Sequence, residues 1–149
     1  MLLSLLILFI AIQLIQPARN NRGQILAADL TKIYVVPEKV LSVLQNSCYD
    51  CHSNHTRYPW YANIQPGSWL MAHHIKEAKA DLNFSEFGKF SIRRQQSKLQ
   101  AIANSIEDGT MPLCSYAVIH TDAKLSGDQK SLIFDWIKIT KDSLSLIGP

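Results

Sequence analysis

The apolar residues of this chain recur at helical spacing over most of its length, and this pattern limits the fold more than any other feature. From Val35 onward they repeat at intervals of three and four residues, and no stretch alternates apolar and polar residues for long enough to predict a strand. The chain has 149 residues, which is enough for one domain with its own core. We therefore predict a single all-α domain.

Local end signals predict about four helices in this domain. Pro37 suits the first position of a helix, because its missing N–H would have no partner there, and the apolar spacing continues that helix through Cys51. A second helix is expected from Ser68. A third is expected from about Ser91 to Gly109, a residue that favours the position just past a helix end.

The last helix is predicted to open at Ser126. Gln129 stands three residues further on and completes the pattern of a capping box, in which two side chains satisfy free backbone N–H groups. The helical spacing then predicts a buried face made of Leu132, Ile133, Trp136 and Ile137.

The N-terminal residues form an apolar targeting or anchoring segment. Met1 to Ile15 contains no charged residue, and it fits a signal-peptide core better than a full membrane span of about 20 residues. The start lacks Lys or Arg, and the cleavage site at Leu26-Ala27-Ala28 is poor. We therefore predict that residues 1–17 form an uncleaved signal-anchor, and a cleaved signal peptide is the alternative. Residues 18–34 are then a polar linker, and residues 35–149 are the exported domain.

The sequence Cys48-Tyr49-Asp50-Cys51-His52 is the C-x-x-C-H pattern of c-type haem attachment. Residues three and four apart share a face of a helix, so Cys48, Cys51 and His52 are expected to project to the same side. Two thiols there can bond to the two vinyl groups of one porphyrin, while the imidazole reaches the iron. The motif therefore predicts one covalent haem c with His52 as an iron ligand.

Three other uses of these cysteines are open. Cys48 and Cys51 could form a structural disulfide, although this leaves His52 unexplained. A thioredoxin-like redox pair would need a surrounding βαβ pattern, which the sequence does not show. A zinc site could combine the cysteines with two other histidines, but no second pair stands at zinc-finger spacing; those histidines are His55, His73, His74 and His120.

Met111 is the candidate for the second axial ligand of the iron. It lies in Gly109-Thr110-Met111-Pro112, in a loop before the last helix, and Met is a known partner of haem-ligating His. The alternatives are that Met111 only fills the core, or that His74 takes this position. His73 is adjacent to His74 and so lies on another helix face.

The sequence supports two further predictions, one for the third cysteine and one for a group of aromatic residues. Cys114 is the odd cysteine, and we expect it to be a small buried residue. Aromatic residues gather after the motif, and we expect them to wrap the porphyrin edge; they are Tyr58, Trp60, Tyr61 and Trp69.

The chain resembles known haem proteins at two levels. The order of the C-x-x-C-H helix, the Met111-Pro112 loop and the last helix is similar to that of class I cytochromes c. More closely, four stretches resemble the small haem-binding-domain family of exported bacterial proteins, and they are Cys48–Asn54, Tyr58–Tyr61, Trp69 with His74-Ile75, and Leu82–Ser85. The resemblance implies a small cytochrome c-like bundle of helices around one haem. An N-terminal apolar helix precedes this bundle and anchors it to the membrane.

These observations together predict an electron carrier and not an enzyme. A haem held by His52 and Met111 would pass single electrons between redox partner proteins at the membrane or in the periplasm, with the domain on the periplasmic side of a bacterial inner membrane. A haem-based sensor or gas-binding module with an open sixth position is the alternative. The net charge of +3 is modest and the basic residues are scattered, so no nucleic-acid partner is expected.

Overall fold

The computed structural model describes residues 1–146 of the chain, and this part is all helical, as predicted. Residues 147–149, the end of the predicted domain, lie outside the described residues. Four helices correspond to the four that the sequence predicts for the domain, and they are α3 (Glu38–Ser47), α5 (Gly67–Asp81), α6 (Ile92–Glu107) and α8 (Gly127–Ser145). The α-helices α1 (Leu2–Gln13), α2 (Leu30–Ile33), α4 (Tyr49–His52) and α7 (Cys114–Ile119) and the 3₁₀ helices η1 (Trp60–Asn63), η2 (Phe84–Lys89) and η3 (Thr121–Ala123) complete the described part.

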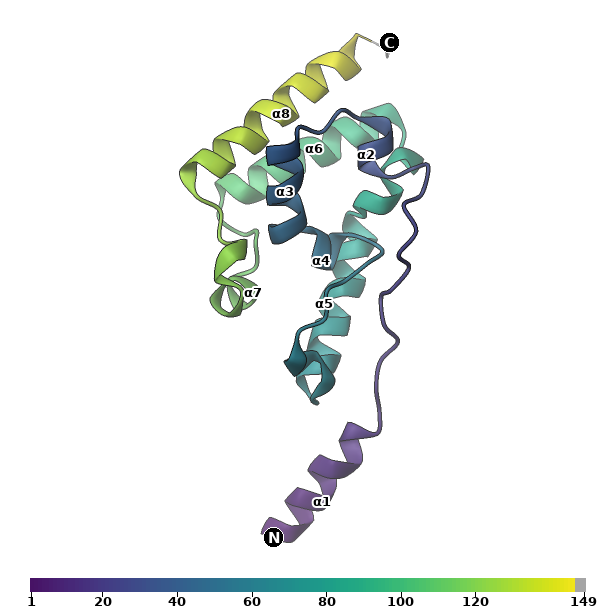
Figure 1. The fold of residues 1–149 in the computed structure, drawn as a ribbon, viewed down its shortest axis with the longest axis vertical. Helices are drawn as coiled ribbons and strands as arrows, with labels where there is room; N and C mark the ends of the chain where they lie inside the picture. The colour runs from purple at the N-terminus through teal and green to yellow at the C-terminus, as the bar shows by residue number, and fades with distance from the viewer. Residues whose placement is uncertain (147–149) are drawn as a thin grey trace.

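The core lies where α3, α6 and α8 meet. Helices α6 and α8 lie side by side, and α3 packs against α8 and against the short helix α4 (Figure 1). Burial of apolar side chains in this core is the main stabilising term of the fold. The core residues are Leu30, Val40, Val43, Leu44, Leu82, Phe84, Phe87, Leu99, Ile102, Ile106, Ile133, Trp136, Ile137 and Leu144.

The predicted helix ends are confirmed at three places. Ser91 accepts a hydrogen bond from the N–H of Arg94 at the start of α6. Ser126 and Gln129 form the capping box that opens α8. Gly109 has a positive φ of 69° just after α6, in the left-handed region that glycine adopts without a steric penalty. The predicted buried face of α8 is wrong at one position, because Leu132 lies on the exposed side of the helix.

The helix that carries the C-x-x-C-H motif is not continuous. The backbone at Cys48 leaves the helical region, with φ −129° and ψ −41°, and this residue separates α3 from α4. Pro37 is the residue before the first turn of α3, where the sequence predicts it inside that turn. Prediction of one helix from Pro37 through Cys51 is therefore wrong, and the motif forms a single turn that begins at the break.

Residues 18–34, which the sequence predicts to be a linker, pack on the domain. Asn20 is bonded to the 53–58 loop, since its side chain donates to the Ser53 carbonyl at 2.8 Å and its carbonyl accepts from the N–H of Thr56 at 3.0 Å. Asp29 caps α2 through the N–H of Thr31, and Leu30 is completely buried in the core. The chain thus reaches the core before Val35.

The apolar N-terminal segment forms α1, which projects from the end of the domain opposite to α8 (Figure 1). Among the described residues, no helix combines the length and the apolar character that crossing a membrane requires. The predicted N-terminal segment is thus helical but is no candidate for a membrane span, and an anchoring role of α1 stays a prediction.

Candidate haem site

The C-x-x-C-H motif forms one tight turn beside a cavity. The N–H of His52 donates to the carbonyl of Cys48 at 2.9 Å, and the N–H of Cys51 donates to the same carbonyl at 3.2 Å. These bonds keep the helical offset of three and four residues in spite of the break at Cys48. All three side chains are half-buried and line the cavity.

The ring of His52 is fixed by a backbone group from a distant part of the chain. Its Nδ1 donates a hydrogen bond of 3.0 Å to the carbonyl of Leu82, just after α5. Because a carbonyl only accepts, this bond places the ring proton on Nδ1 and leaves the lone pair of Nε2 free, as a metal-ligating histidine requires. Burial lowers the pKa of His52, although the hydrogen bond to Leu82 opposes this shift, and a lowered pKa favours the neutral imidazole.

The two cysteines of the motif are free thiols in an apolar environment. Burial raises the pKa of the Cys48 thiol to about 12, and the neighbouring Cys51 adds to the shift. Burial also raises the pKa of Cys51 to about 11, with a smaller effect of Asp50. The raised pKa values of both cysteines favour the protonated thiols at neutral pH.

The cavity has two adjoining lobes of about 80 Å³ and about 300 Å³, and the larger lobe is at the low end of the range for small-molecule sites. Its walls come from α4, the ends of α5 and α6, and the loop before α7. Six residues line both lobes: Ser47, Cys48, His52, Asp81, Met111 and Pro112. The structure thus brings Met111 to the same cavity as the motif. His74 lines the larger lobe but not the smaller one.

The backbone of Met111 is held at the end of α6. Its N–H donates to the carbonyl of Ser105 at 3.1 Å, and the N–H of Thr110 donates to the same carbonyl at 3.0 Å. The positive φ of Gly109 allows the chain to turn back over the last turn of α6. The loop therefore approaches the cavity from the α6 side, while His52 approaches it from α4.

Asp50, at the centre of the motif, joins α4 to two other parts of the chain. It is buried, and its carboxylate accepts from the backbone N–H of Arg57 at 3.0 Å and from the Arg57 guanidinium at 3.2 Å. The hydroxyl of Tyr116 donates to the other carboxylate oxygen at 2.8 Å. Tyr116 belongs to α7 and lines the larger lobe, so this bond connects the motif to the helix that follows Met111.

Comparison with known sequences gives the same cofactor as the geometry of these residues. Residues 7–139, which are most of the chain, match the profile described as "Haem-binding domain". The chain belongs to the haem-binding-domain family. No curated protein and no solved structure matches the chain significantly.

The residues around the cavity of this haem-binding domain fit a haem. Two thiols and an imidazole with a free Nε2 lie on one turn, and a thioether lies in the wall of the same lobes. Apolar side chains make up much of the remaining wall, and they can cover a porphyrin face and exclude water from the iron. Among residues 1–146, no group of three or more His, Cys, Asp or Glu side chains is placed to hold a metal ion.

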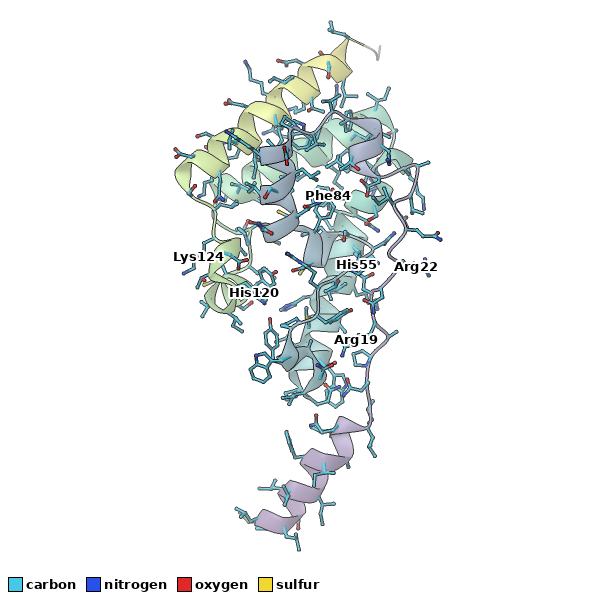
Figure 2. All side chains as sticks on the ribbon, viewed as in Figure 1. Arg19, Arg22, His55, Phe84, His120 and Lys124 are labelled. Carbon is cyan, nitrogen blue, oxygen red and sulfur yellow. The ribbon has the colours of Figure 1, made fainter. Side chains whose placement is uncertain are left out.

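The aromatic residues that line the cavity of the haem-binding domain are not the ones that follow the motif in sequence. The residues after the motif do not line either lobe: Trp60 is exposed, Trp69 donates to the Ile15 carbonyl, and the Tyr58 hydroxyl accepts from the N–H of Asn20. The aromatic residues of the cavity are Phe84, whose place inside the bundle Figure 2 shows, and Tyr116. None of Tyr58, Trp60, Tyr61 and Trp69 lines the cavity, and their place at the porphyrin edge stays a prediction.

Other residues singled out in the sequence lie outside the cavity. Cys114 is exposed at the start of α7, so its predicted burial is wrong. His55 and His73 are exposed, and the Nε2 of His120 lies 2.7 Å from the Tyr61 hydroxyl. The sequence missed Lys98 and Asp81, which form an ion pair of 2.6 Å at the cavity wall. Neither residue belongs to a motif. The one sequence signal near them is the expected end of the second helix, which lies close to Asp81.

Proposed function

We propose that this haem-binding domain holds one haem covalently and works as a single-electron carrier. Cys48 and Cys51 would hold the porphyrin by thioether bonds, and His52 would ligate the iron through Nε2. Met111 would supply the second axial ligand. The observation that carries this proposal is the hydrogen bond from His52 Nδ1 to the Leu82 carbonyl, which leaves Nε2 free on the same turn as two free cysteines.

Met111 is preferred to His74 on two grounds. Met111 lines both lobes of the cavity, whereas His74 lines only the larger one. The Met111 backbone is also fixed by the Ser105 carbonyl at the end of α6, so little freedom is lost when the thioether binds. His74 is the second candidate.

The surrounding residues support electron transfer better than catalysis. When bound, a haem with two axial ligands supplies a one-electron couple whose potential depends on those ligands and on burial. The apolar wall made of Phe84, Ile102 and Ile106 would keep water from the cofactor. A peroxidase-like reaction would need an acid/base pair such as a distal His with Arg, and the described cavity lining contains no arginine.

We also infer that the domain is exported and works at a membrane, on the periplasmic side of a bacterial inner membrane. Support comes from α1, whose apolar side chains are exposed from Leu2 to Ala11. Its partners would be redox proteins at that membrane or in the periplasm. Fractionation of cells, followed by N-terminal sequencing of the haem-containing fraction, tests this location; recovery of a soluble chain starting near Ala28 would contradict an uncleaved anchor.

The spectrum of the reduced protein with and without carbon monoxide tests the electron-carrier proposal. A thioether that already occupies the sixth position should prevent ready binding of the gas, so the two spectra should be nearly the same. Immediate and complete binding of carbon monoxide would contradict the proposal. It would favour the alternative function, a haem-based sensor or gas-binding module.

A further inference from the structure

We propose that one end of the domain, and not α1 alone, rests on a lipid bilayer. This end consists of Trp60 and Ile64, at and just after η1, and of Trp69 and Leu70 in the first turn of α5; we call these four residues the collar. The proposal rests on the proposed membrane location and adds a defined orientation of the domain.

Helix α1 has no side that suits water. Leu5, Leu6, Ile7 and Leu8 are consecutive, so they point in directions about 100° apart and together go round the helix. Each is at least 55% exposed. A helix that is apolar on all sides needs apolar surroundings on all sides, which the hydrocarbon of a bilayer provides. Its length of about 18 Å would take it part of the way through a core of about 30 Å.

The end of α1 is tied to the domain by side-chain hydrogen bonds. Gln65 is buried; its backbone N–H donates to the Gln13 side chain at 2.8 Å, and its own side chain donates to the Ile15 carbonyl at 2.7 Å. The indole N–H of Trp69 donates to the same carbonyl at 2.9 Å, and Ser68 donates to Gln16 at 3.2 Å. Insertion of α1 therefore brings the start of α5 to the bilayer surface.

The collar has the composition of a membrane-interface surface. Trp60 is 75% exposed and Leu70 is 56% exposed, although both could have been polar at no cost to the core. Tryptophan is enriched at the boundary between lipid and water, where its ring sits at headgroup depth. The indole of Trp69 already has its hydrogen-bond partner, so its exposed ring can enter an apolar layer.

Charge at this end favours anionic lipid. Neither residues 1–28 nor residues 53–76 contain Asp or Glu, whereas Arg19 lies on the segment that joins α1 to the rest of the domain (Figure 2). The Arg19 guanidinium lies 4.3 Å from the centre of the Tyr58 ring, which holds it beside η1. Basic residues at this depth are attracted to the negative surface of a bilayer.

This orientation also fixes the height of the haem site. Helix α5 starts at the collar and lines the cavity with residues from His74 to Asp81, and its 15 residues span about 22 Å. With the collar on the bilayer, the cavity lies within about one helix length of the lipid surface. A redox partner held in the same membrane would meet the site at that height.

Photo-crosslinking of the full haem-loaded chain to vesicles of phosphatidylcholine and phosphatidylglycerol tests the proposal. One set of vesicles carries a diazirine near the glycerol backbone of the lipid, and a second set carries it in the acyl tail. We expect the first probe to label peptides containing Trp60 to Leu70, and the second to label Met1 to Gln13. Labelling of α1 without the collar would overturn the collar and leave the membrane location intact, whereas labelling of neither would overturn both.

Substitution of the collar gives a second, independent readout. Trp60→Ser with Leu70→Ser should weaken vesicle binding about tenfold in a flotation assay, because it removes apolar area from the contact. Ile139→Ser is the matched control, since Ile139 is also an exposed aliphatic residue but lies on α8 at the opposite end (Figure 1). Equal loss in both variants, or a dimer that forms through the collar without lipid labelling, would contradict the proposal. An unchanged haem spectrum shows that the variants are folded.

Discussion

The hydroxyl of Tyr116 donates a 2.8 Å hydrogen bond to Asp50, across 66 positions of the sequence. Asp50 lies between the two cysteines of the motif, and Tyr116 lies on the helix that follows the Met111 loop. The bond therefore connects the turn that carries His52 with the segment that carries the proposed second ligand. It is one of the contacts that fix the distance between the His52 turn and the Met111 segment.

Removal of this bond should loosen the Met111 side of the site. Tyr116→Phe keeps the ring that stacks on His120 but leaves the Asp50 carboxylate with one partner fewer. A hydrogen bond to a charged group contributes about 1.5–3 kcal/mol, so urea unfolding should show a loss of that order. Carbon monoxide should bind more readily to the reduced variant than to the native protein.

Tyr58→Phe is the matched control for this substitution. The Tyr58 hydroxyl also takes part in a hydrogen bond, with the N–H of Asn20 at 2.7 Å, but Tyr58 does not line the cavity. We expect a loss of about 1 kcal/mol in stability and no change in carbon monoxide binding. If both variants bind the gas equally well, the Tyr116 bond has no specific role at the site.

Met111→Ala should open the sixth position of the iron and leave the covalent attachment in place. Thioether sulfur raises the haem potential relative to an imidazole or water ligand, so its loss should lower the potential. The absorption band of sulfur bound to oxidised iron should disappear, and carbon monoxide should bind. His74→Ala is the control, and it should do none of these. The reverse result would mean that the iron has two histidine ligands.

Phe84 should be needed for the position of His52. It is buried, its ring stacks on Tyr49 with centroids 5.0 Å apart, and it meets the His52 ring edge-on at 6.2 Å. Phe84→Ala should cost about 3–5 kcal/mol in unfolding experiments and broaden the haem spectrum as His52 loses this contact. Leu132→Ala, at the exposed side of α8, should change neither measurement by much. An unaltered spectrum in a destabilised Phe84 variant would limit Phe84 to a role in the core.

The parts of the fold that depend on neighbours in sequence could be predicted. Ser91, Gly109 and the Ser126 capping box mark helix ends because their hydrogen bonds and backbone angles are local. The C-x-x-C-H motif is local for the same reason, since its geometry needs only one helical turn. These features led to an all-helical fold and to haem as the cofactor.

Contacts between distant segments could not be read from the same patterns. The bond from His52 to Leu82 crosses 30 positions and uses a backbone carbonyl, which every residue has. Trp60 and Trp69 follow the motif in sequence, yet Gln65 and Ile15 direct this segment away from the cavity toward α1. Leu30 enters the core from a stretch with no apolar periodicity, because one buried side chain makes no pattern.

The central claim is that this chain holds its haem through Cys48 and Cys51, and mass spectrometry of the denatured protein tests it most directly. The protein is expressed in cells that export it and supply haem. It is then unfolded and extracted with acid-acetone, and its mass is measured by mass spectrometry. We expect the protein to retain the mass of one haem, and the Cys48→Ala, Cys51→Ala double variant to lose it during extraction. A native chain that gives up its haem to the solvent, or a double variant that retains it, would contradict the account.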